Sequence, residues 1–435
     1  MRQPLRDARP AGTRGVMRAA RTAHVTLRVQ IDTLCYEGVP VAKGTSSGLL
    51  EQQRSQSIFK HKLLEDYVLP FAEMTGSKVE GRRVVVVDGF AGRGRYPDGR
   101  PGSAELILRT AERASRATIE PILVEKNPAD FKQLAAVVAE YRARGVRAEP
   151  LPDDVLQHLP LVLHRAADVP LFLFLDPCGA NLPYDALAAL VSGPRRSLWP
   201  PTELLLNFSA DLTRRAAGAL KAGIMDHHAL PVMDRTCGGT WWRQVALAAQ
   251  ASSPTGDFEK AAFAVVEEYA RRLGVAGGMY PVTVPVRRRI HHQPVYHLVF
   301  LTRRSHGVWV FATALAQARQ EWMRRLGPAD DDVTDTLFSF ANAVEDHIDS
   351  EQQRAQAVVA GNLRDLVAKR PVFRLVDQPW EVFERVYGVA TEPTVRQAVN
   401  GQERARQIRV IERKMHVRDW RVARPDRAIA SARPR

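Results

Sequence analysis

The feature that most constrains this chain is a series of short apolar runs, each followed by a stretch with helical spacing. The runs are VVVV (84–87), the ILV of EPILVEKN (120–127), LFLFL (171–175) and the LLL of TELLLNFS (202–209). Strand-sized runs without polar alternation are typical of strands that are buried on both faces. The alternation of strands and helices therefore predicts an α/β fold with a mostly parallel, doubly wound sheet.

The length of 435 residues predicts more than one domain. We expect residues 1–57 to form a poorly ordered basic extension with one short strand at 24–31. We place the sheet domain at 58–327 and start it with a helix, because the apolar residues from position 58 recur at helical spacing. Within it, 282–311 predicts strands that end in an antiparallel pair. A basic, helix-rich module follows at 345–435.

Composition argues against several classes of protein. No apolar run approaches the roughly 20 residues of a membrane-spanning helix, and no hydrophobic segment follows the Arg-rich N-terminus. The three cysteines, Cys35, Cys178 and Cys237, lie far apart and form no CxxC pair, which argues against a disulfide framework and a zinc site. We expect a cytoplasmic protein with reduced thiols and no metal centre.

The positive charge lies at the two ends of the chain. Residues 1–30 have a net charge of +6 and residues 401–435 a net charge of +7, out of +14 for the whole chain. Basic tails attract nucleic-acid phosphates independently of sequence. Solvated Arg-rich tails, an organelle transit peptide and an over-long gene start are open alternatives.

The strongest local signal is VVVVDGFAGRGRY (84–96), a buried strand that runs into a glycine-rich turn. Asp88 ends the strand, and Gly92 and Gly94 follow it. Ligands bind at the carboxyl ends of strands in such sheets, and glycines let the backbone approach a ligand closely. Glu125 ends the next strand, where an acid commonly binds ribose hydroxyls. The turn carries Phe90 where the first Gly of GxGxxG would lie, which argues against NAD.

The form D-x-F-A-G-x-G resembles the cofactor turn of S-adenosylmethionine-dependent methyltransferases that act on nucleic-acid bases. The resemblance implies that the glycine turn packs against the methionine part of the cofactor and that Glu125 binds its ribose. It also implies that Asp154, or Asp153 in its place, contacts the adenine amino group. A helix cap before VLQHL is an equally good interpretation of these two acids.

The segment LFLFLDPCG (171–179) resembles the fourth strand of amino-methyltransferases, where Asp or Asn precedes Pro. The resemblance implies that Asp176 and Pro177 orient the amino group that is methylated. The aromatic residue that stacks a flipped base is missing there, and Tyr184 or Phe90 could supply the ring. A helix-capping role for Asp176 is the alternative. Cys178 is better interpreted as a buried structural residue than as a nucleophile.

Several segments together resemble the three-Cys-motif partner protein family, TcmP, over about 58–311. The segments are KHKLLEDYVLPF, VVVVDGFAGRGRYPDGRPGSAELIL, ILVEKN, LFLFLDPCG, LLLNFS and MDRTCGGTWW. The resemblance implies a Rossmann-like class I methyltransferase domain with a C-terminal winged-helix module, and a genomic partner that resembles radical-SAM proteins. The candidates that it carries over are Lys62, Asp88, Phe90, Gly92, Gly94, Gly102, Ser103, Glu125, Asp176 and Pro177.

Two regions are candidates for nucleic-acid binding. One is a basic rim formed by Arg287, Arg288 and Arg289, beside His291 and His292. The other is a helix–turn–helix pattern at 380–411, with its second helix capped near Thr394. A winged helix would place Arg396 and Gln397 of this helix in a major groove. A helical domain that binds protein is the alternative for the second region.

These observations predict a methyltransferase with S-adenosylmethionine as cofactor, acting on an exocyclic amino group of a nucleic-acid base. Two alternatives are open. One is a non-catalytic partner protein that binds cofactor or nucleic acid. The other is a methyltransferase that acts on a protein or a small molecule.

Overall fold

The computed structural model describes residues 27–28, 49–177, 182–254, 256–288, 292–325 and 334–425. The predictions for Cys178, Arg289 and His291 fall outside these ranges, as do those for most of the N-terminal extension and for the tail beyond residue 425.

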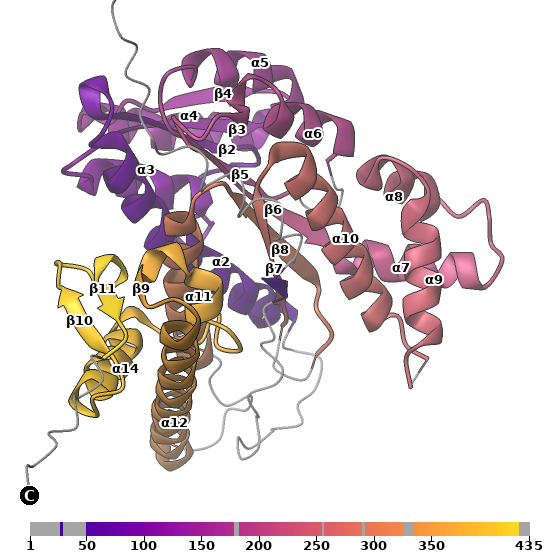
Figure 1. Cartoon of the computed structure of the whole chain (residues 1–435). Helices are drawn as coiled ribbons and strands as arrows, with labels where there is room; N and C mark the ends of the chain where they lie inside the picture. The colour runs from indigo at the N-terminus through magenta and orange to yellow at the C-terminus, as the bar shows by residue number, and fades with distance from the viewer. Residues whose placement is uncertain are drawn as a thin grey trace, which may run out of the picture.

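The core of the protein is an eight-stranded sheet in the order β1-β7-β8-β6-β5-β2-β3-β4 (Figure 1). Strand β8 is antiparallel to both of its neighbours, β6 and β7, and every other pair is parallel. The strands are β1 Leu27–Arg28, β2 Arg83–Asp88, β3 Thr118–Glu125, β4 Glu149–Pro152, β5 Leu171–Leu175, β6 Thr202–Ser209, β7 Tyr280–Val286 and β8 Tyr296–Thr302. The predicted α/β fold with a mostly parallel, doubly wound sheet is confirmed.

Helices cover both faces of the sheet, which explains the continuous apolar runs. Val84 and Val86 of β2 belong to the apolar cluster on one face, and Val85 and Val87 belong to the cluster on the other. The helices of the first face are α2 Leu49–Gly76, α3 Ser103–Arg113, α4 Pro128–Ala143 and α11 Ser305–Arg325. Those of the second are α5 Val155–Arg165, α6 Tyr184–Ser192, α7 Ala210–Lys221, α8 Ala229–Cys237, α9 Trp241–Ala251 and α10 Glu259–Gly277.

Helix α2 is the central element of the first face. It begins at Leu49, before the position that we predicted, and it packs along α11. Tyr67 lies between aromatic rings of the sheet and of α11, with its ring centroid 5.6 Å from Phe172 and 5.6 Å from Phe311. The Tyr67 hydroxyl donates a hydrogen bond to the buried carboxyl of Glu203 on β6. This packing fixes the helix that reaches the candidate site.

The prediction of strand structure as far as residue 311 is wrong. Strand β8 ends at Thr302, and SHGVWVF begins helix α11. Val308, Trp309, Val310 and Phe311 are all buried. A short, fully buried apolar run looks the same whether it is a strand or a buried helix, so periodicity could not distinguish the two.

The C-terminal module, which we expected to be helix-rich, contains short strands as well as helices. It consists of α12 Thr334–Lys369, β9 Val372–Arg374, α13 Pro379–Val382, α14 Glu392–Arg404, β10 Arg409–Glu412 and β11 Arg421–Ala423. The three short strands form an antiparallel sheet in the order β10-β11-β9. Strands of three or four residues leave almost no alternating pattern in a sequence.

The module packs directly against α11, as Figure 1 shows. The rings of Trp309 and Phe383 meet edge to face at 4.7 Å, and the Tyr387 hydroxyl donates to the Val308 carbonyl at 2.7 Å. The apolar cluster of the first sheet face continues through these residues into the module. The module and the sheet domain therefore share one core.

A buried ion pair joins α11 to α12. Arg319 donates to Glu351 at 2.6 and 2.7 Å, and the two side chains are 3% and 1% exposed. We predict that Glu351→Ala lowers the free energy of unfolding by about 3–5 kcal/mol, because it removes the carboxylate that compensates the buried Arg319 guanidinium.

The matched control is Glu345→Ala, which breaks the exposed Arg324–Glu345 pair between the same two helices. It should change the free energy of unfolding by less than about 1 kcal/mol. Urea unfolding measures both variants. Equal losses would show that burial of the Arg319 pair is not what matters.

Candidate functional site

The site lies at the switch point of the sheet, where the strands that follow β2 in sequence lie first on one side of it and then on the other. Strand β2 pairs with β3 on one side and with β5 on the other, and ligands bind at such switch points. Asp88 is the last residue of β2, and its register partner on β5 is Phe174. Asp176 follows two residues beyond Phe174. The two aspartates that the sequence singled out therefore come together at one edge.

Asp88 is fully buried and holds the glycine-rich turn in place. Its carboxyl accepts a hydrogen bond from the Ser103 hydroxyl at 2.6 Å and another from the Phe90 backbone N–H at 3.1 Å. Burial raises the pKa of Asp88 to about 7 in spite of both hydrogen bonds. The group is thus poised to change its charge near neutral pH.

The turn itself needs its glycines. Gly92 and Gly94 have φ angles of +59° and +81°, a region that side chains disfavour. A Cβ at Gly102 would lie 2.9 Å from the Gly94 carbonyl oxygen, which accepts the Gly102 N–H at 2.9 Å. At Gly92, no heavy atom lies within 4 Å of the place where a Cβ would be. The turn is therefore held by the Gly102–Gly94 hydrogen bond and is open at Gly92.

The insertion at 95–103 forms a small folded loop that returns the chain to Asp88. Arg95 pairs with Glu105 at 2.7 Å and with Glu140 at 3.0 Å, and it forms an antiparallel bridge with Pro101. Glu105 is itself buried. The insertion that lengthened the spacing in the sequence therefore delivers Ser103 to its partner, Asp88.

The acids at or just beyond the ends of β3 and β4 make different hydrogen bonds. Glu125 ends β3, is partly buried and accepts the Asn127 N–H at 2.6 Å through one oxygen. Asp154 is the N-cap of α5 and accepts the Leu156 N–H at 3.0 Å. The capping interpretation of Asp154 is therefore confirmed. Its predicted contact with the cofactor stays a prediction.

Asp176 is held by an ion pair and by a side-chain hydrogen bond. Lys60 of α2 forms an ion pair with one oxygen, and Asn207 of β6 donates to the other at 2.7 Å. Burial alone would raise the pKa of Asp176, but the Lys60 charge and these hydrogen bonds outweigh burial and hold it below its usual value. Asp176 is therefore ionised at neutral pH.

Two lysines of α2, Lys60 and Lys62, have different partners, and the predicted contact of Lys62 with the cofactor stays a prediction. Lys62, which we predicted to contact the cofactor, pairs at 2.7 Å with Asp66 one turn along its own helix. Lys60 is the residue that reaches Asp176. Its helical spacing could have revealed that it faces the sheet, since Lys60 lies on the same stripe as the buried Leu64 and Tyr67, whereas Lys62 does not. Asn207 had no comparable signal in the sequence.

The two rings proposed to replace the missing aromatic residue are both partly buried. Phe90 and Tyr184 both pack against the apolar cluster of the second sheet face. The ring of Tyr184 meets that of Tyr269 edge to face at 6.0 Å. Pro177 is buried directly after Asp176.

Some of the residues that we predicted to bind nucleic acid contact other residues of the protein. Arg287 follows the carboxyl end of β7 and pairs with Glu259 at 3.0 Å. Arg288 is partly buried beside it. Arg396 lies with its guanidinium 5.3 Å from the centre of the Trp420 ring and donates to the Met415 carbonyl at 3.3 Å. The cap of α14 is Thr391, whose hydroxyl shares a hydrogen bond with Thr394.

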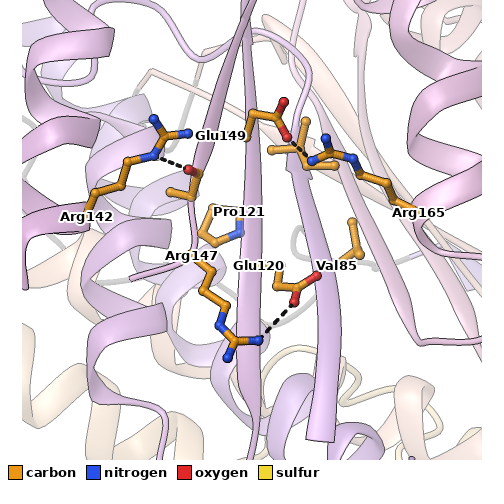
Figure 2. Close-up of a pocket in the computed structure, with 9 residues that line it drawn as sticks. Val85, Glu120, Pro121, Arg142, Arg147, Glu149 and Arg165 are labelled. Carbon is orange, nitrogen blue, oxygen red and sulfur yellow. Dashed lines mark hydrogen bonds and ion pairs between the residues drawn. The ribbon is translucent and has the colours of Figure 1, made fainter. Parts of the chain in front are cut away.

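Figure 2 shows a separate pocket over the starts of β2, β3 and β4, away from the carboxyl edge. Its arginines contact neighbouring groups: Arg165 pairs with Glu149, Arg147 lies 3.8 Å from Glu120, and Arg142 donates to a backbone carbonyl. The pocket is thus distinct from the site of Asp88 and Asp176.

Among the described residues, no helix combines the length and the apolar composition that a membrane span requires. Within the same residues, no group of three or more His, Cys, Asp or Glu side chains is arranged to hold a metal ion.

Comparison with known proteins gives structural likeness only. No family model and no curated protein sequence matches the chain. Among solved structures it is similar to the small RNA methyltransferase HEN1, at 12% identity and a TM-score of 0.32 over 60% of this chain and 27% of that one. It is similar to the O-methyltransferase TomG from Streptomyces achromogenes, solved with SAM, at 13% identity and 0.30 over 60% and 91%. The chain thus spans about a quarter of the HEN1 chain.

We predict that Lys60→Met destabilises the protein by about 3 kcal/mol at pH 8, because it leaves the mostly buried Asp176 carboxylate, 17% exposed, without its cation. The loss should shrink at pH 5. Without Lys60, burial raises the pKa of Asp176, so the folded variant gains stability as its carboxyl protonates. Urea unfolding at both pH values tests this.

Lys126→Met is the control, because Lys126 pairs with Asp154 at 3.4 Å while 77% exposed. That variant should behave like the wild type at both pH values. A Lys60→Met loss that is independent of pH would contradict the role assigned to the ion pair.

Proposed function

We propose that this protein is an S-adenosylmethionine-dependent methyltransferase that methylates an exocyclic amino group of a nucleic-acid base. The observation that carries the proposal is the pair of aspartates at the switch point. Asp88 ends β2 directly before the glycine turn, and Asp176 directly follows the adjacent β5 and pairs with Lys60. At these positions, Asp88 can contact the cofactor while Asp176, on the adjacent strand, contacts the group that accepts the methyl.

The residues present fit the cofactor. The turn is open at Gly92, where a Cβ would meet no atom within 4 Å, so a ligand can approach the backbone. One oxygen of Glu125 accepts the Asn127 N–H, and its second oxygen is suited to a ribose hydroxyl. Asp88 can bind the positively charged end of the cofactor once it ionises. When bound, S-adenosylmethionine supplies a methyl carbon on a cationic sulfur, which becomes a neutral thioether.

The chain's own contribution to the reaction is orientation and charge. Asp176 already accepts one hydrogen bond on each oxygen, and a carboxylate has room for about four. It can therefore accept an N–H from the acceptor and aim the nitrogen lone pair at the methyl carbon. The nitrogen gains a C–N bond and loses one proton. Because Lys60 keeps the pKa of Asp176 low, that proton passes to water and Asp176 stays ionised.

The C-terminal module supports a nucleic-acid substrate. We interpret the order α12-β9-α13-α14-β10-β11 as that of a winged helix, with α14 as its second helix of a helix–turn–helix pair. Basic side chains are exposed from the end of α14 through the β10–β11 hairpin, where they can bind phosphates. They are Arg404, Arg406, Arg409, Arg413, Lys414 and Arg421. We further propose that a three-Cys-motif protein is the partner.

Cofactor binding should depend on pH through Asp88. Its pKa of about 7 in the free protein means that it is protonated at pH 5.5 and mostly ionised at pH 7.5. A cationic ligand prefers the ionised form, so we predict that S-adenosylmethionine binds about tenfold more tightly at pH 7.5. Calorimetry measures this.

Asp88→Asn should bind weakly at both pH values. The control Asp377→Asn removes an exposed acid of the C-terminal module, 46% exposed beside Arg374, and should bind like the wild type. No binding by the wild-type protein would overturn the cofactor assignment.

Methyl transfer is tested with labelled S-adenosylmethionine and total cellular DNA and RNA. We predict label that nucleases release as methylated nucleosides. Asp176→Asn should lower kcat at least about a hundredfold, since it removes the oriented acceptor of the N–H bond, while the Kd of the cofactor changes little. Label that only proteases release would instead indicate a protein substrate.

A further inference from the structure

An orphaned hydroxyl lies beside the Lys60–Asp176 pair. Tyr296 is the first residue of β8, which runs antiparallel to β6, so it lies at the carboxyl edge opposite Ser209. Its side chain is 6% exposed, and among the described residues its hydroxyl has no hydrogen-bond partner. Lys60 Nζ is 5.2 Å from the centre of its ring. A buried hydroxyl without a partner is costly, and a ligand would satisfy it.

A second tyrosine lies next to helix α2, which carries Lys60. Tyr96 lies in the inserted loop and is 42% exposed. Its backbone N–H donates to Arg100 at 2.8 Å and its carbonyl accepts the Gly99 N–H at 2.9 Å, so the loop is folded around it. The Tyr96 ring is 6.1 Å from that of His61 and tilted to it by 42°. An exposed aromatic ring is thus held beside α2.

Lys60 and His61 link the two tyrosines. The Lys60 ammonium pairs with Asp176 and lies 5.2 Å from the centre of the Tyr296 ring, and the ring of the neighbouring His61 lies 6.1 Å from that of Tyr96. His61 next to it stays neutral, because burial and the Lys60 charge lower its pKa to about 4. The surroundings therefore combine a neutral aromatic wall, an ammonium and an unpaired hydroxyl. These are the groups that bind a planar, uncharged heteroaromatic ring through its face and its edge.

We propose that Tyr96, Tyr296 and Lys60 form the acceptor subsite, which takes a planar nucleobase. The Tyr96 ring stacks on the face of the base, and the Tyr296 hydroxyl hydrogen-bonds to its edge beside Asp176. Tyr96 then supplies the stacking ring that the sequence lacks after Pro177. The proposal rests on the proposed function, because it assumes that Asp176 receives the amino group of the same base.

The test uses the full-length protein with its cofactor site saturated by S-adenosylhomocysteine. The probes are single-stranded DNA and single-stranded RNA 12-mers, each with one 2-aminopurine, whose fluorescence is quenched on stacking against an aromatic ring. Wild type and Tyr96→Phe should quench the probe. Tyr96→Ala should lose the quenching and bind the probe about tenfold more weakly, because a stacked base is lost.

Trp199→Ala is the matched control. Trp199 is an exposed ring, 39% accessible, that precedes β6 at the opposite edge of the sheet. Its removal should leave the quenching unchanged. Equal quenching by wild type and Tyr96→Ala, or none by the wild type with either probe, would overturn the subsite. The proposed function fails separately, if S-adenosylmethionine itself does not bind.

The variant Tyr296→Phe tests whether the Tyr296 hydroxyl binds the base, independently of any effect on the stability of the protein. Since the described residues give its hydroxyl no partner, the variant should keep or slightly raise the melting temperature. We predict that it nevertheless binds the 2-aminopurine probe about tenfold more weakly, because the edge hydrogen bond is lost. Unchanged probe affinity would refute the role of this hydroxyl, whatever the melting temperature.

Discussion

The ion pair between Lys60 and Asp176 ties helix α2 to the carboxyl edge of the sheet and sets the electrostatics of the site. A buried carboxylate is costly unless a cation and hydrogen bonds compensate it, and here Lys60 and Asn207 do so. Asp88, on the neighbouring strand, has no such cation bound to it, and burial raises its pKa to about 7. Two carboxyl groups at adjacent strand ends therefore have pKa values shifted in opposite directions. Such a division is typical of sites in which two acids have different tasks.

The same helix connects the site to the rest of the molecule. Tyr67, two turns along α2 from Lys60, contacts Phe311 of α11, and α11 in turn packs against the C-terminal module through Trp309 and Phe383. One apolar cluster runs through all of these elements. The proposed nucleic-acid module is thus held in a fixed orientation to the sheet domain, so a bound strand would be presented to the site in a defined way.

The elements with strong local signals could be predicted from the sequence. The buried strands, the turn after Asp88 and the meeting of Asp88 with Asp176 follow from apolar runs and parallel topology. The first two turns of helix α11 could not be distinguished from a strand, because Val308 to Phe311 form a continuous buried run. The contact between Lys60 and Asp176 joins positions 116 residues apart, and the stripe that Lys60 shares with Leu64 and Tyr67 indicates only that it faces the sheet. Asn207 and Tyr296 lie on strands whose patterns indicate burial and nothing about which residues they face.

The most direct measurement is a crystal structure of the protein with S-adenosylhomocysteine. We expect the ligand to lie over the turn at Gly92, with its ribose hydroxyls on Glu125, its amino acid end near Asp88 and its sulfur facing the Lys60–Asp176 pair. A ligand bound in the arginine-lined pocket at the other end of the strands, or density that leaves the turn at Gly92 untouched, would contradict this expectation.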